Sequence, residues 1–347
     1  PYHATPFIGR VDLLDDLTDA FGVQGRRLIT LGGTGGVGKT RLSVQYAQEN
    51  QRYFPGGIWF CDLSDVDALD GVCTAVANAL EVPLRLGHPI EQLAKTIASK
   101  KRCLLILDNF EHVVGCAQDT LGIWLKKAPL ACFLVTSRET LRIDGEHVLS
   151  VTPFPMDDAV NLFAEYASRA APGFDCSPEK RPIIETIINE LDQIPLAIEL
   201  AAKRLRTLGL EQLKERLTQR FRLLRTRGKR VGGRQATMQA TIAWSWSLLD
   251  PIEQSVCAQA SLFRGGFTLE AAETIIYLPS QDRFELEEVI GALVDKHLIQ
   301  RSAPLEGMVR FTMYESLREY ALHRQNELNA TLLSDHERLS GTDAERA

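Results

Sequence analysis

Short apolar runs alternate with amphipathic segments between residues 26 and 152 of the 347-residue chain. Strands that are buried on both faces are apolar throughout, so this alternation predicts a parallel β-sheet flanked by helices. The predicted strands are 27–31, 57–62, 103–108, 131–136 and a shorter one near 147–151. The pattern therefore favours an α/β domain over residues 1–153.

The strand pattern stops after Pro155, and three or four helices are expected up to about residue 221. One of them should begin at Ser177, because Pro178 follows this capping residue at the first helical position. Residues 154–222 are therefore predicted to form an all-α helical domain.

A third unit is predicted over 235–330. Asp250 and Glu253 form a capping-box pattern at the start of one helix. A later helix (284–297) precedes two short apolar runs (298–302 and 309–313) and a further helix (314–328). Helices followed by a two-stranded wing are typical of a winged-helix domain. Residues 331–347 are interpreted as a tail or the start of a following domain.

The segment between these units is strongly basic. Residues 220–234 carry seven basic side chains and no acidic one, and their glycines indicate a linker, which we place at 223–234. Basic runs are usually solvated or face an acidic surface. A contact with DNA is the alternative that this charge leaves open.

A glycine-rich segment matches the phosphate-binding pattern G-x-x-x-x-G-K-[ST] between a predicted strand and a predicted helix. Glycines allow backbone N–H groups to surround an anion at the positive end of the helix dipole. Lys39 is expected to reach the β and γ phosphates, and Thr40 to bind Mg²⁺. The predicted nucleotide-binding residues are Gly33, Thr34, Gly35, Gly36, Val37, Gly38, Lys39, Thr40 and the adjoining Arg41.

Asp108 ends an apolar run, as the acidic residue of a Walker B motif does. Because parallel strands end beside the phosphate loop, Asp108 should hold Mg²⁺ through a water molecule. Many fast P-loop hydrolases place a carboxylate next, but this chain has Asn109, which cannot accept a proton. Glu111 could act instead from the following turn. We therefore expect slow or conditional ATP hydrolysis.

Arg138 follows the predicted strand 131–136 on the same edge of the sheet. A guanidinium there could bind a γ-phosphate through two hydrogen bonds and so distinguish ATP from ADP. Spacing alone favours a surface arginine equally. The candidate catalytic residues are Lys39, Asp108, Glu111 and Arg138.

Composition narrows the class of protein. The net charge of −6 argues against a protein that coats nucleic acid. No apolar stretch approaches the roughly 20 residues that cross a bilayer, so a cytoplasmic location and no membrane partner are expected. Scattered histidines and seven cysteines without a C-x-x-C motif leave nucleotide-bound Mg²⁺ as the expected metal. Because the chain starts at Pro1, effector and sensor domains of a longer polypeptide are expected to flank it.

These motifs, in this order over most of the chain, resemble the signal-transduction ATPases with numerous domains (STAND) of the NB-ARC type. Residues 33–40 resemble the family's Walker A motif, and residues 104–112 resemble the Walker B motif of bacterial regulators. Thr136, Ser137 and Arg138 resemble the sensor-1 triplet. The resemblance implies that Arg138 contacts the γ-phosphate.

Further peptides extend the resemblance. It implies that Ile8 and Arg10 line the adenine pocket and that Pro195 packs on adenine, although Gln193 replaces the usual glycine. Tyr314 stands where plant resistance proteins have the histidine of a Met-His-Asp motif. A hydrogen bond from Tyr314 to the nucleotide is therefore expected. The segments 241–249 and 262–268 look like the winged-helix part of bacterial members.

The sequence therefore predicts a nucleotide-controlled switch module of a signalling or transcriptional regulator. ADP is expected to hold a closed resting state and ATP an open, self-associating state that slow hydrolysis resets. Two alternatives stay open: an AAA+-like ATPase that acts on DNA, and a winged-helix DNA-binding transcription factor with a structural nucleotide. The acidic charge and Asn109 disfavour the first, and only the basic segment favours DNA.

Overall fold

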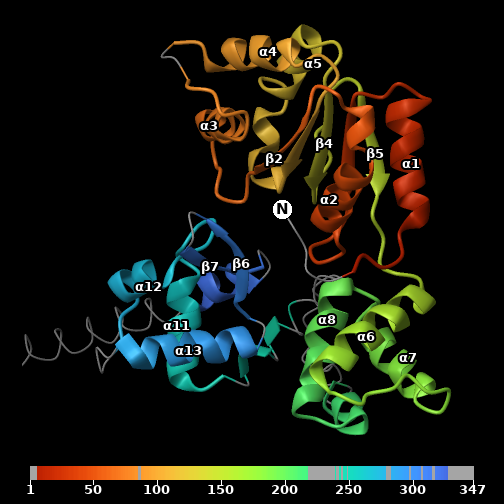
Figure 1. The fold of residues 1–347 in the computed structure, drawn as a ribbon, viewed down its shortest axis with the longest axis vertical. Helices are drawn as coiled ribbons and strands as arrows, with labels where there is room; N and C mark the ends of the chain where they lie inside the picture. Colours follow the sequence, from red (N-terminus) through yellow and green to blue (C-terminus); the bar gives the residue numbers. More distant parts are fainter. Residues whose placement is uncertain are drawn as a thin grey trace, which may run out of the picture.

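A computed structural model describes residues 6–84, 87–217, 239, 242–243, 245–247, 249–278, 283–296, 298–305, 308–314 and 317–326. The predicted linker 223–234 and the tail 331–347 lie outside the described residues. In Figure 1 the chain passes from a sheet with helices on its faces, through a group of helices, to a C-terminal part that contains a hairpin. No helix of the described residues is long and apolar enough to span a membrane.

Five parallel strands form the sheet, in the order β2-β3-β4-β1-β5 (Figure 1). Each predicted apolar run is a strand, so the parallel α/β architecture is confirmed. Strand β1 lies between β4 and β5, and β4 separates it from β3. The strands are β1 (Leu28–Gly32), β2 (Ile58–Asp62), β3 (Leu104–Asp108), β4 (Cys132–Ser137) and β5 (Glu146–Ser150).

The two faces of the sheet have separate cores, because successive strand residues point to opposite faces. Leu104 and Ile106 of β3 pack in one core with residues of α1 (Val11–Gly22) and α2 (Lys39–Glu49). Leu105 and Leu107 pack in the other with residues of three further helices. These helices are α3 (Leu69–Ala79), α4 (Pro89–Ser99) and α5 (Leu121–Lys127), and the short helices η1 (Gln51–Tyr53) and η2 (Phe110–Cys116) lie in loops.

The middle part is helical, as predicted. It contains α6 (Met156–Ala170), α7 (Arg181–Glu190), α8 (Pro195–Ala202), η3 (Lys203–Arg206) and further helical residues at 210–217. The expected helix start at Ser177 is wrong, because α7 begins at Arg181. The carbonyl oxygen of Ser177 accepts hydrogen bonds from the N–H groups of Lys180 (3.0 Å) and Arg181 (3.1 Å) and so closes a turn. Pro182, which lacks an N–H group, stands in the first turn of the helix instead.

The C-terminal part contains α11 (Pro251–Ala260), α12 (Leu269–Ile275), α13 (Arg283–Asp295) and the antiparallel pair β6 (Gln300–Leu305) and β7 (Met308–Thr312). Helical residues follow at 317–326. Its buried apolar side chains join those of α6, α7 and α8 in one continuous cluster. The middle and C-terminal parts therefore share a core, while each face of the sheet has a core of its own.

The predicted capping box at the start of α11 is present. The side chain of Asp250 accepts a hydrogen bond from the N–H group of Glu253 (2.8 Å), and Glu253 accepts one from the N–H group of Asp250 (2.9 Å). Glu253 also pairs with Lys296, which follows α13. The cap therefore fixes both the start of α11 and its position beside α13.

We expect Asp250→Ala to lower the free energy of unfolding of this part by about 1 kcal/mol, because the N–H group of Glu253 loses its acceptor. Chemical denaturation would measure the loss. Asp250→Ser retains a capping oxygen and should lose much less, so equal losses in the two variants would show that the cap is not the cause.

Candidate nucleotide-binding site

Three neighbouring strands bring the candidate residues to one edge of the sheet. The phosphate loop follows β1, residues 136–138 end and follow β4, and Asp108 ends β3. Because the strands are parallel and adjacent, their carboxyl ends lie side by side. Residues that are far apart in the sequence therefore meet there.

The phosphate loop has the backbone shape that an anion site requires. Gly38 precedes α2 with φ of +94°, which favours glycine. A Cβ atom at Gly33 would lie 2.5 Å from the carbonyl oxygen of Val151, so only glycine fits there. The N-terminus of α2, an 11-residue helix, directs its free N–H groups toward the loop. The loop is therefore compatible with a bound phosphate.

Lys39 is folded onto this loop. Its Nζ donates hydrogen bonds to the carbonyl oxygens of Gly33 (2.8 Å) and Thr34 (3.2 Å), and the residue is only 8% exposed. Burial lowers the pKa of Lys39, and Glu111 opposes this change by its negative charge. A buried ammonium group held by carbonyl oxygens gains charge-assisted hydrogen bonds when a phosphate lies beside it.

Asp108 is the centre of a buried polar cluster. Its carboxylate accepts hydrogen bonds from the hydroxyl groups of Thr40 (2.8 and 3.0 Å) and Thr136, and from Nδ2 of Asn109 (3.2 Å). Burial raises the pKa of Asp108 to about 7, and the bonds from Thr136 and Thr40 oppose this shift. The structure thus joins Thr40 and Asp108, the two predicted metal ligands.

The donor set fits a magnesium ion, which prefers oxygen ligands and brings water and phosphate oxygens with it. Thr40 and Asp108 supply such oxygens. Oε2 of Glu111 is buried and has no hydrogen-bond partner among the described residues. The described part of the chain contains no group of three or more His, Cys, Asp or Glu side chains that could hold a metal without a nucleotide. A cation here would therefore depend on the nucleotide.

Arg138 connects this edge of the sheet to the C-terminal part. Its Nε forms an ion pair with Oε1 of Glu111 at 2.9 Å. Its Nη2 donates to Oε1 (3.0 Å) and Oε2 (3.2 Å) of Glu319, in the helical residues 317–326. Two of the four candidate catalytic residues, Glu111 and Arg138, are thus in contact. Arg138 also binds Glu319, which is not one of these candidates.

The N-terminal peptide and the start of α8 also touch the phosphate loop. Nη2 of Arg10 donates to the carbonyl oxygen of Val37 (3.2 Å), and the N–H group of Leu196 donates to that of Gly36 (3.1 Å). The Arg10 guanidinium lies 4.5 Å from the ring centre of Phe154, and burial lowers its pKa to about 10. Ile8 is half-buried against the helical core.

Gln193, which replaces the glycine expected before Pro195, still has the left-handed backbone conformation that favours glycine. Gln193 has φ of +57° and Asp192 has φ of +49°. The carbonyl oxygen of Gln193 accepts a hydrogen bond from the N–H group of Phe154 (3.1 Å), and Pro195 starts α8. Pro195 therefore lies beside the loop after two residues with positive φ, of which Gln193 stands where the sequence pattern has glycine.

Tyr314 is turned toward the middle part of the chain. Its hydroxyl donates to Oε1 of Glu199 (2.9 Å), which also pairs with Lys203 (2.6 Å). Burial is the main cause of the pKa of Tyr314 lying well above its usual value. Arg41 donates to the hydroxyl of Tyr166 on α6 (3.3 Å). The expected nucleotide contacts of Tyr314 and Arg41 stay predictions.

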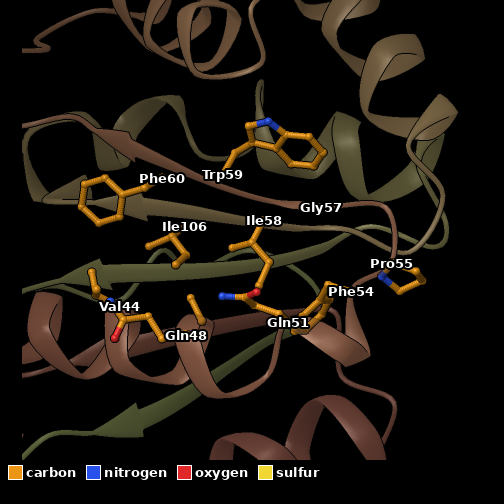
Figure 2. Close-up of a pocket in the computed structure, with 11 residues that line it drawn as sticks. Val44, Gln48, Gln51, Phe54, Pro55, Gly57, Ile58, Trp59, Phe60 and Ile106 are labelled. Atoms are coloured by element: carbon orange, nitrogen blue, oxygen red, sulfur yellow. The ribbon is translucent and has the colours of Figure 1, made fainter. Parts of the chain in front are cut away.

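A cavity of the sheet domain lies away from this site. It has a volume of about 650 Å³ and is lined by apolar side chains and glutamines between α2 and strands β2 and β3 (Figure 2). No charged side chain lines it, so it does not suit a phosphate. A smaller cavity of about 410 Å³ lies between Ile8 and α6.

Sequence reasoning missed three residues of this region. Glu319 lies 181 positions from Arg138, and no sequence signal marks it. Phe154 and Asp158 follow β5, the last strand of the sheet, and lie against the N-terminal peptide that contains Arg10.

The chain is similar to several known proteins. Residues 23–143 match the AAA domain family. The uncharacterized protein Rv0894 of Mycobacterium tuberculosis is 31% identical over 94% of this chain and 82% of its own length. The chain belongs to the family of Rv0894. Its sheet domain is a P-loop AAA-type ATPase domain.

Two longer proteins are also similar. Rv0890c of the same organism, named as a candidate HTH-type transcriptional regulator, is 34% identical over 86% of this chain. The chain spans 34% of the length of that relative. A STAND protein with a tetratricopeptide repeat sensor from Pyrococcus horikoshii has a similar fold, with a TM-score of 0.54, 16% identity, and coverage of 93% of this chain and 43% of its own.

The raised pKa of Asp108 predicts a pH dependence of stability without nucleotide. Folded Asp108 keeps its proton up to about pH 7, while an unfolded aspartate loses it near pH 3.9. Between these values the folded state holds more protons, so this group lowers stability as pH rises. Asp108→Asn removes the titration.

The variant should therefore gain stability relative to the wild type from pH 4 to pH 7.5, by more than about 1 kcal/mol. Urea denaturation at several pH values would measure the difference. If the free energies of unfolding of the two proteins changed with pH in parallel, the raised pKa of Asp108 would be refuted.

Proposed function

We propose that this chain is the ATP- and ADP-binding switch module of a STAND-type signalling or transcriptional regulator. The ADP-bound form is closed, with the three parts in contact. The ATP-bound form is open and associates with itself. Slow hydrolysis of ATP returns the module to the closed form.

The contact between Arg138 and Glu319 is the observation that carries this proposal. Arg138 lies where a γ-phosphate is expected, beside the phosphate loop and Asp108, yet it also binds the C-terminal part. A ligand shifts a conformational equilibrium only through a difference in its affinity for the two states. A group that binds either the γ-phosphate or the C-terminal part supplies such a difference.

Slow hydrolysis follows from the residue after Asp108. Asn109 donates through Nδ2 to Asp108 and to Asp62 (3.4 Å), so its amide is held as a hydrogen-bond donor and cannot serve as a base. Glu111 has one free carboxylate oxygen and is the better candidate to orient water. Mg²⁺ held by Thr40 and Asp108 would supply charge neutralisation at the phosphates.

The order of elements in the C-terminal part supports a winged-helix domain, since α11, α12 and α13 precede the pair β6–β7. A DNA-binding regulator is the second candidate, because Rv0890c is named as a transcriptional regulator. Filter binding to duplex DNA at two salt concentrations would separate the two functions, because phosphate contacts weaken steeply with salt.

We expect Lys39→Ala to lower ADP affinity more than a hundredfold, because no other residue of the loop supplies a cation to the β-phosphate. Calorimetry with the 347-residue chain would measure this loss. Lys126→Ala, at an exposed position on α5, is the matched control and should bind ADP as the wild type does. Undiminished affinity in the Lys39 variant would refute the site.

We expect Arg138→Ala to weaken ATP binding about ten- to hundredfold and to leave ADP affinity within about twofold. The reason is that a charge-assisted hydrogen bond to the γ-phosphate is absent in the ADP complex. Calorimetry with both nucleotides measures the ratio. Equal losses for ADP and ATP would make Arg138 a structural residue and place the γ-phosphate sensor elsewhere.

A further inference from the structure

The C-terminal part contacts the sheet through two neighbouring residues of opposite charge. Arg318 lies 3.7 Å from Oδ1 of Asp65, in the loop after β2, and Glu319 pairs with Arg138 after β4. Arg264 adds a hydrogen bond to the carbonyl oxygen of Asp65 (3.2 Å). Because the two ion pairs have opposite polarity, exchanging the partners would place like charges together.

The carboxylate of Glu319 accepts hydrogen bonds from Arg138 as a phosphate group would. Both oxygens of its carboxylate lie within 3.2 Å of Nη2, while Nε is taken by Glu111. A γ-phosphate carries several acceptor oxygens and negative charge, so it would use the same guanidinium nitrogen. The two anions therefore compete for Arg138.

We propose that Glu319 is a specificity-determining residue that makes this site prefer a nucleoside diphosphate to a nucleoside triphosphate. The inference rests on the proposed function and names the residue that regulates it. A diphosphate leaves the Arg138–Glu319 pair intact. A triphosphate binds Arg138 only after Glu319 has left, and the two negative groups repel one another while both are close.

The expected change in nucleotide preference follows from the solvent exposure of the Arg138–Glu319 pair. The side chain of Arg138 is 29% exposed and that of Glu319 is 39% exposed, so solvent screens part of their attraction. We therefore expect Glu319→Gln to raise ATP affinity relative to ADP affinity by about three- to tenfold, with ADP affinity changed by less than about twofold. Gln keeps the size of the side chain and removes its charge.

Calorimetric titration of the 347-residue chain with ADP and with ATP, each with Mg²⁺, tests the proposal. Glu288→Gln is the matched control, because it removes the same charge from an exposed position on α13. It should leave the ratio of the two affinities at the wild-type value. The Glu319→Ala variant is a second test that does not depend on the packing of the glutamine.

Arg318→Ala separates specificity from loosened packing. This variant removes the contact with Asp65 and keeps Glu319 on Arg138. If Glu319 acts only by holding the C-terminal part in place, Arg318→Ala should raise the relative affinity for ATP as much as Glu319→Gln does, because both variants weaken the closed form. We expect a smaller rise, of less than about twofold, because Arg138 keeps its competing anion.

The background variant Arg138→Ala completes the test. Adding Glu319→Gln to it should change the affinity ratio by less than about twofold, because the group for which the two anions compete is gone. A full effect of Glu319→Gln in this background, or no effect in the wild type, would overturn the proposal. Failure of the wild type to bind either nucleotide would instead overturn the proposed function.

Discussion

Arg138 provides an electrostatic connection between the carboxyl edge of the sheet, where the phosphate loop lies, and the C-terminal part. Its guanidinium pairs with Glu111 on one side and with Glu319 on the other. The pair with Glu319 is partly exposed, so solvent weakens its attraction. A weak contact of this kind suits a switch, because a ligand of modest differential affinity can replace it, whereas a deeply buried pair would resist replacement.

The position of Arg138 is a consequence of the sheet. Parallel strands bring their carboxyl ends to one edge, and β4 lies between β1 and β3. Arg138 therefore follows the strand that separates the phosphate loop from Asp108. The same edge receives the N-terminal peptide through Arg10 and the start of α8 through Leu196. Contacts at this edge thus extend to three segments of the chain, namely the N-terminal peptide, α8 and the C-terminal part.

Most of the sheet and of the phosphate site could be predicted from local sequence. The five apolar runs predicted the strands, and the glycine-lysine-threonine pattern with Asp108 predicted the polar cluster at their ends. Both signals are local, because burial on two faces and a left-handed glycine each restrict the residue type at the position itself. The capping box at Asp250 was predictable for the same reason.

The contacts between parts were not predictable, because each depends on two surfaces that the sequence does not align. Glu319 has no distinguishing pattern around it, and its role depends on how the C-terminal part is placed on the sheet. The start of α7 was misplaced for a different reason. Two prolines, Pro178 and Pro182, each suit a helix start, and only the turn closed by Ser177 decides between them.

Tyr314 and Glu319 connect the C-terminal part to its neighbours in physically different ways. Tyr314 is neutral, since burial raises its pKa well above the usual value, and it donates to a glutamate that Lys203 already compensates. Glu319 carries a charge and holds an arginine beside the phosphate loop. A change in the charge of a bound phosphate would act directly on the contact between Glu319 and Arg138. The contact between Tyr314 and Glu199 is neutral overall and joins the C-terminal part to the middle part of the chain. In the proposed switch, the C-terminal part would therefore separate from the sheet while it stays attached to α8, with which it shares a core.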